Sequence, residues 1–140
     1  MKAMKILFCL WSAVCIVSCN KTSEYTHYVN EQLEKHYAAE MTRYEYIVVI
    51  PRQGCHSCIK SAETFFNASK DLSNYFFIFT RVNSIKKLGL EIGKDNLTRK
   101  NVRIDQDNLF YNKSCNDSNY PLLLHKEADG TFSYKRLVSN

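Results

Sequence analysis

An uninterrupted apolar run near the middle of the chain is the clearest feature of its hydrophobic pattern. Tyr46–Ile50 is rich in β-branched residues and has no charged position. Such a run is typical of a strand buried on both faces of a mainly parallel sheet. Pro51 and Gly54 then end the strand pattern. Beyond them, apolar residues recur every three to four positions and predict a helix that ends near Asn67–Ser69: Ile59, Ala62 and Phe65 or Phe66.

A second helical stripe lies nearer the N-terminus. Its apolar residues are four apart, and Ser23 is placed to be the N-cap of the helix that carries them. We interpret the stripe as core packing rather than a cofactor site. Its members are Tyr25, Val29, Leu33, Tyr37 and Met41.

The second half of the chain predicts further short elements. Asp129-Gly130 is a strong signal for a two-residue hairpin turn between two strands. A polar segment, Gly93–Lys100, separates the elements that precede the hairpin. In chain order we predict strand Tyr75–Val82, helix Ser84–Ile92, strand Val102–Ile104, and hairpin strands Leu122–Leu124 and Thr131–Leu137.

Length and composition agree with one globular α/β domain. The chain has 140 residues, of which 45% are hydrophobic, and this is enough to form a single core. No internal repeat, low-complexity tract or second domain is visible in the sequence.

The first residues read as a processing segment rather than part of the fold. Lys2 and Lys5 precede the apolar run Ile6–Ser18, which is too short to cross a bilayer and predicts a signal peptide. Ile16-Val17-Ser18-Cys19 resembles the bacterial lipobox, so we expect lipid attachment at Cys19. The alternative is a secretory signal cut elsewhere, with Cys19 an ordinary thiol. The predicted organisation is signal peptide 1–18, lipidated tether 19–23 and folded domain 24–140.

Charge argues against one class of partner. The whole chain carries a formal charge of +5, and without Lys2 and Lys5 there remain 17 basic and 14 acidic residues, or +3. With no basic block in the sequence, we expect no nucleic acid among the partners.

The cysteines narrow the candidate chemistry. After loss of the signal and lipidation of Cys19, the domain keeps Cys55, Cys58 and Cys115. Cys55 and Cys58 stand between the predicted strand and helix, where unpaired N–H groups and the helix dipole favour a thiolate. We expect Cys55 to be the exposed thiolate and Cys58 the more shielded partner. For Cys115 the favoured reading is a buried small apolar residue, although it could approach the pair.

The order helix, strand, CxxC-helix, strand, helix, short strand, proline and hairpin resembles the thioredoxin superfamily, over roughly Tyr44–Leu137. More narrowly, it resembles membrane-tethered extracytoplasmic thiol-disulfide oxidoreductases. The resemblance implies a three-layer sandwich with a central mixed sheet and a C-terminal β-hairpin. It also implies a cis proline at Pro121 beside the cysteines. The sequence departs from the family at three positions. Gly54 stands where the family usually has an aromatic residue, and Ser57 where it usually has proline. Val49 stands where thioredoxins often have a buried acid.

We expect the helix that follows the hairpin in that family to be missing here. We therefore expect the N-terminal helix to cover one face of the sheet. Apolar residues on the other face should stay partly open to a partner or a second copy.

Function follows from this resemblance as an expectation. It implies disulfide exchange with extracytoplasmic protein thiols by catalytic Cys55 and Cys58, with no cofactor beyond their redox-active disulfide. Tyr120 and Pro121 would support the pair, and a protonated His56 would favour the Cys55 thiolate. An exposed histidine of small effect is an equal alternative for His56. The expected setting is the bacterial cell envelope, lipid-anchored and periplasmic or surface-facing, with a redox partner protein.

Two other classes of function stay open. The chain could be a tethered binding module of the same fold, in which the CxxC disulfide is a structural staple or inert. A metal site ranks third, because zinc needs four ligands and Cys55 with Cys58 supplies two. Haem attachment is disfavoured since Ile59 rather than histidine follows Cys58, and copper handling through His125 is a weak further alternative. We predict no metal site.

Overall fold

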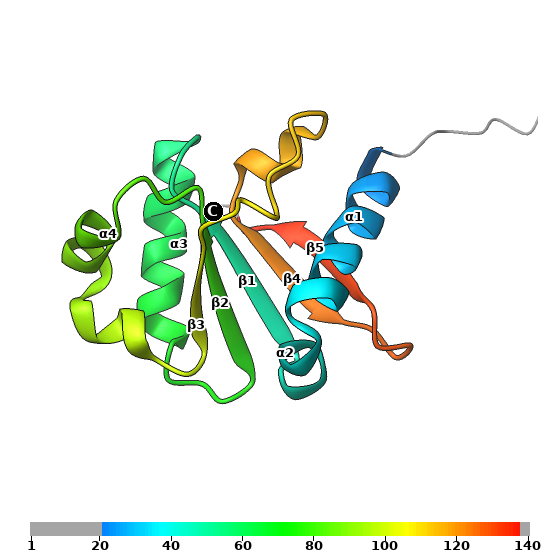
Figure 1. The fold of residues 1–140 in the computed structure, drawn as a ribbon, viewed down its shortest axis with the longest axis horizontal. Helices are drawn as coiled ribbons and strands as arrows, with labels where there is room; N and C mark the ends of the chain where they lie inside the picture. The colour runs from blue at the N-terminus through cyan, green and yellow to red at the C-terminus, as the bar shows by residue number, and fades with distance from the viewer. Residues whose placement is uncertain (1–20, 138–140) are drawn as a thin grey trace, which may run out of the picture.

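The computed structural model describes residues 21–137, and a five-stranded sheet forms its centre (Figure 1). The expected signal peptide and lipid attachment at Cys19 lie outside these residues, whereas 21–23, expected to end the tether, are already helical. The elements are α1 (Lys21–His36), α2 (Ala38–Arg43), β1 (Tyr46–Pro51), α3 (His56–Ser69), β2 (Tyr75–Thr80), α4 (Ile85–Ile92), the 3-10 helix η1 (Lys94–Thr98), β3 (Val102–Asp105), the 3-10 helix η2 (Asn116–Asn119), β4 (Leu122–Lys126) and β5 (Phe132–Arg136).

The sheet is mixed, in the order β3-β2-β1-β4-β5. β1 pairs in parallel with β2, and β2 with β3, while β4 is antiparallel to both of its neighbours. In this register Val48 lies opposite Phe77 on one side and Leu123 on the other. β1 is therefore the central strand, which explains why its sequence is apolar on both faces.

Helices cover both faces of the sheet and give three layers. Figure 1 shows α1 and α2 on one side and α3 and α4 on the other. On the α1 side, Tyr25, Val29 and Leu33 pack in one core with sheet residues such as Ile47 and Phe76. A separate core on the α3 side is built from Val48, Ile50, Ala62, Phe66, Phe77, Phe79, Leu88, Ile92 and Val102. The α/β fold class is confirmed, and the arrangement is that of a thioredoxin-like sandwich.

The N-terminal stripe packs in the core as predicted, but it does not lie on one helix. Tyr37 separates α1 from α2 with a non-helical backbone conformation, while its ring packs beside Phe76 and Phe110. The predicted N-cap is also wrong, because Ser23 is already inside α1. Burial of an aromatic ring has outweighed helix continuity at Tyr37.

Two turns differ from the prediction. β2 ends at Thr80 rather than Val82, because Arg81 adopts the left-handed φ of 55°. The hairpin between β4 and β5 is not a two-residue turn: Glu127 still pairs with Thr131, whose carbonyl accepts its N–H at 2.8 Å. Gly130 has φ 85°, so the loop is a three-residue turn with glycine in the left-handed position.

The α3 face is less completely covered than the α1 face. Over β4 it has a hollow of about 330 Å³ lined by Tyr46, Leu123, His125, Ser133, Tyr134 and Lys135. Leu123 is half-buried, whereas its neighbour Leu124 on the α1 face is fully buried. The expectation that apolar residues of this face stay partly open is met at Leu123. No helix among the described residues is long and apolar enough to cross a membrane.

Candidate functional site

Cys55 and Cys58 form a disulfide where the chain passes from β1 into α3. Their Cα atoms are 5.3 Å apart. Cys55 is the N-cap of α3, and the backbone N–H of Cys58 donates to its Sγ at 3.3 Å. The predicted position of the pair at a strand-to-helix junction is therefore what the structure shows.

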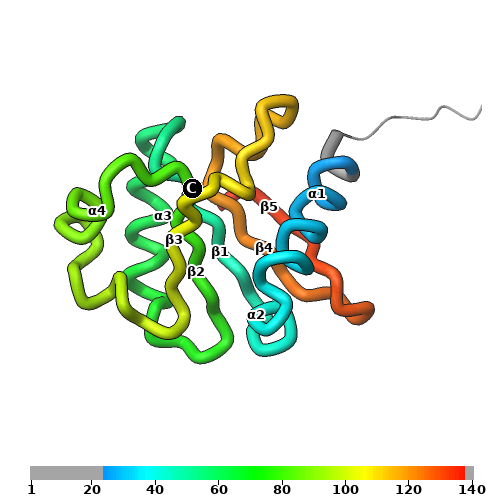
Figure 2. The backbone as a smooth tube through the Cα atoms, in the orientation of Figure 1, coloured from blue at the N-terminus to red at the C-terminus, as the bar shows by residue number. Residues whose placement is uncertain are grey.

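Gly54 makes the turn into α3 possible. Its φ of 117° is one that side chains rarely adopt. A Cβ at this position would also lie only 2.8 Å from the carbonyl oxygen of Asn119. Both features require glycine, and the close approach places the CxxC loop against the segment that precedes Pro121. Figure 2 shows these two segments at the same end of the sheet.

The surroundings of the pair favour negative charge on sulfur. The first turn of α3 contains no acidic residue, and the N-terminus of a 14-residue helix carries partial positive charge. His56 and Ser57 are exposed, so an incoming partner would meet them together with the disulfide. Cys55 and Cys58 are both half-buried, so burial in the disulfide form does not separate the predicted exposed thiolate from its shielded partner.

The segment that precedes Pro121 lies against Gly54, but the peptide bond before Pro121 is not cis, contrary to what the resemblance implied. No cis bond occurs among the described residues, and trans is the form of lower free energy for most X–Pro bonds. The strand that Pro121 precedes is not a free edge, because β4 lies inside the sheet. The carbonyl of Pro121 already accepts the N–H of Leu137 at 2.7 Å.

Tyr120 is held from the hairpin side. Its ring lies under the guanidinium of Arg136 at 4.0 Å, and Arg136 Nε donates to Asp117 Oδ1 at 2.7 Å. Burial alone would raise the pKa of Asp117, but hydrogen bonds from Tyr134 and Arg136 outweigh it and lower that pKa. Asp117 thus stays ionised and ties η2 to β5.

Arg81 is a site residue that the sequence did not indicate. It follows β2, and its side chain donates to Gln53 and to Asn119, which stand on the two segments around the disulfide. No pattern marks this arginine, since its partners are 28 and 38 residues away in the chain. A left-handed φ at a residue other than glycine could not be read from the sequence either.

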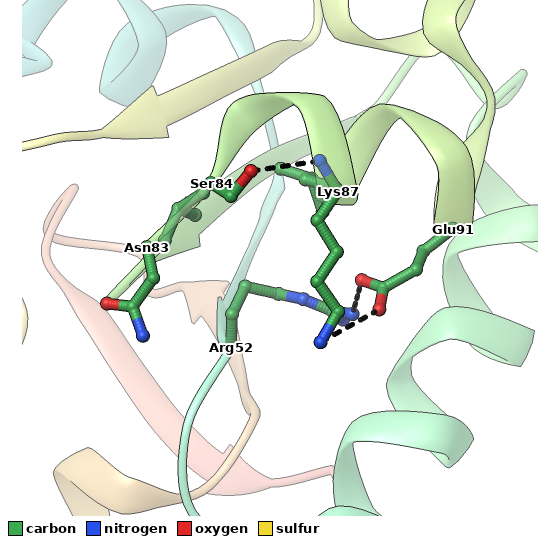
Figure 3. A pocket seen from close by; sticks show the side chains of 7 residues that line it. Arg52, Asn83, Ser84, Lys87 and Glu91 are labelled. Atoms are coloured by element: carbon green, nitrogen blue, oxygen red, sulfur yellow. Dashed lines mark hydrogen bonds and ion pairs between the residues drawn. The ribbon is translucent and has the colours of Figure 1, made fainter.

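A small cavity of about 100 Å³ lies between Arg52, which follows β1, and α4. Figure 3 shows the Arg52 side chain reaching toward Glu91 of α4, with Lys87 on the same helix and Ser84 at its N-cap. Arg52 Nη2 donates to Glu63 at 2.6 Å and to Glu91 at 2.5 Å. This nearly buried cation therefore fastens the end of β1 to α3 and α4.

The remaining candidates lie away from the disulfide or do not form a metal site. Cys115 is half-buried and packs against the α1-side core, in line with the apolar reading. The His125 ring lies 5.1 Å from the Tyr46 ring, tilted by 32° to it, on the open sheet face. Within residues 21–137, no three or more His, Cys, Asp and Glu side chains are grouped so as to hold a metal ion.

Comparison of the chain with protein-family models, with curated proteins and with solved structures finds no match.

Proposed function

We propose that this protein exchanges disulfides with protein thiols through Cys55 and Cys58. The observation that carries the proposal is the disulfide itself, at the N-terminus of α3, half-exposed and facing the Asn119 segment. A helix N-terminus stabilises the thiolate that such exchange requires as attacking and leaving group.

The rival reading, a structural staple, has less support. The two cysteines are three positions apart, and closing so small a loop stabilises a fold by only about 2 kcal/mol in the chain-entropy model. The bond also joins residues that the first turn of α3 already holds together through the Cys58 N–H. A staple of this kind would add little to the fold.

The proposed chemistry is a pair of exchanges. In the reduced protein, the Cys55 thiolate attacks a substrate disulfide, forms a mixed disulfide and expels one substrate sulfur, which takes up a proton. Cys58 gives its proton to solvent, attacks Cys55 Sγ and expels the second substrate sulfur. Two electrons pass to the substrate, and a partner dithiol protein restores them. The reverse sequence oxidises a substrate.

Trapping experiments test the order of attack. Cys58→Ser should accumulate partners linked covalently to Cys55, whereas Cys55→Ser should trap few or none and should not reduce insulin disulfides. Resistance of the wild-type disulfide to mild reductant, or equal trapping by both variants, would favour the binding-module reading.

The site of action is a separate proposal that rests on residues 16–19. We place the protein in a bacterial envelope, anchored by lipid on Cys19 and acting on extracytoplasmic proteins. Replacing Cys19 with serine should release it from membranes. Unchanged membrane fractionation of that variant, with no lipid mass on the wild type, would refute the anchor.

A further inference from the structure

Arg81 joins the two segments that flank the disulfide. Its Nη1 donates to Asn119 Oδ1 at 2.8 Å, and its Nη2 donates to Gln53 Oε1 at 3.2 Å. Gln53 immediately precedes Gly54, and Asn119 is two residues before Pro121. A single guanidinium therefore connects the CxxC loop to the segment that faces it.

The arginine is itself held in place. Its guanidinium lies over the Tyr111 ring at 4.3 Å, and its backbone N–H donates to Asn108 Oδ1 at 3.0 Å. The amide of Gln53 returns a hydrogen bond to the Arg81 carbonyl at 3.3 Å. These contacts stabilise the left-handed φ of 55°, a conformation that persists only where the surroundings impose it.

The charge of Arg81 is not neutralised by an ion pair within the described residues, in contrast to that of Arg52. Its hydrogen-bond acceptors are neutral amides. A planar guanidinium can donate in parallel directions to two acceptors, and a lysine ammonium does not reproduce this geometry.

We propose that Arg81 is a positioning residue of the disulfide-exchange site, which sets the separation between the CxxC loop and the Asn119–Pro121 segment. The inference rests on the proposed function. A protein substrate that reaches Cys55 rests against both segments, so their relative position governs how its chain is held. A small disulfide, which needs no such hold, depends much less on Arg81.

The test compares Arg81→Gly and Arg81→Lys with the wild type. Glycine accepts the left-handed conformation without strain, so the first variant removes the guanidinium and preserves the turn. Lysine keeps the charge but does not bridge both amides. Arg43→Ala is the matched control, since it removes a guanidinium stacked over Tyr44 at the opposite end of β1.

For a peptide containing one disulfide, both Arg81 variants should raise KM about tenfold, the size expected when a hydrogen bond to a charged group is lost. Rates with hydroxyethyl disulfide should change less than about threefold, since this small substrate makes no extended contact. Asn119→Ala should reproduce the rise in KM, and the double variant should add little to it. Arg43→Ala should match the wild type.

Equal loss with both substrates at unchanged KM would overturn the inference and leave the proposed function intact. A wild type that reduces neither substrate would overturn the function instead. In that case, hydrogen exchange of backbone amides tests the role of Arg81 independently of activity. Faster exchange at Gly54 and Tyr120 in Arg81→Gly would support its connecting role. Unchanged exchange would overturn it.

Discussion

At the scale of single residues, backbone conformation governs the approach to the disulfide. Gly54 and Arg81 both have positive φ, and they stand just before Cys55 and just after β2. Gly54 accepts its conformation because it has no side chain, whereas Arg81 is held there by its partners. The two residues therefore respond differently to substitution.

Gly54→Ala should destabilise the fold by about 2 kcal/mol or more, because it adds strain at φ 117° to a clash with the Asn119 carbonyl. Gly130→Ala is the control, since φ is 85° there but no atom lies within 4 Å of the added Cβ. It should cost about 1 kcal/mol. Urea unfolding of both variants measures the difference, and equal losses would mean that the approach of Asn119 is not tight.

Asp117 should make stability depend on pH in the acid range. Its pKa is lowered in the folded protein, so its contribution is full above its unfolded pKa of about 3.9 and is lost as pH falls through the folded value. Asp117→Asn should therefore be less stable than the wild type at neutral pH, and the difference should shrink in acid.

Urea midpoints measured across this pH range provide the readout. Tyr134→Phe, which removes one of the donors to Asp117, should show a smaller change of the same sign. A gap between Asp117→Asn and the wild type that stays constant into acid would contradict the assignment.

At the scale of elements, the local sequence pattern was sufficient to predict helices and strands whose structure is determined by residues close in the chain. The apolar run of β1, the spacing in α3 and the helix expected over Ser84–Ile92 all gave elements close to those observed. The break at Tyr37 and the three-residue hairpin loop were missed. The break at Tyr37 depends on packing of its ring beside Phe76 and Phe110, which are distant in the chain. The loop length depends on the register in which β4 and β5 pair.

The candidate site likewise has features that could be predicted from the sequence and features that could not. The junction position of Cys55 and Cys58 followed from sequence, because strand, turn and helix are contiguous there. The contact between Arg81 and Asn119 did not, because it forms only when separate segments meet. The cis form of Pro121 was inferred from resemblance alone, and the structure does not have it.

The capping role of Cys55 can be measured apart from its disulfide. Two double variants, Cys55→Ser with Cys58→Ser and Cys55→Ala with Cys58→Ser, both lack the bond. The first keeps a side-chain acceptor for the N–H that Sγ accepts now, and should be more stable by about 1 kcal/mol. Thermal or urea unfolding gives the comparison, and equal stability would show that α3 does not need this cap.

At the scale of the whole molecule, the two faces of the sheet are unequally closed. The α1 face buries Leu124 completely, whereas the α3 face leaves Leu123 half-buried beside the hollow over β4. A second copy or a partner protein on this face, which we had expected, stays a prediction.

Replacing Leu123 or Leu124 with alanine should change the free energy of unfolding by different amounts. Leu124→Ala should cost about 2–5 kcal/mol, as for a fully buried side chain, and Leu123→Ala about 1 kcal/mol, because its neighbours fill less of the space around it. Urea unfolding at low protein concentration is the measurement. If Leu123→Ala costs more as protein concentration rises, a second copy covers this face.

The close approach of Gly54 to Asn119 also bears on the order in which the protein is made. The cysteines leave the ribosome well before Asn119, and β1, α3 and β2 are contiguous enough to form early. The segment that faces the pair joins only when β4 pairs with β1. We therefore expect the nascent chain to present the thiols of Cys55 and Cys58 uncovered for an interval, during which any neighbouring thiol has access to them.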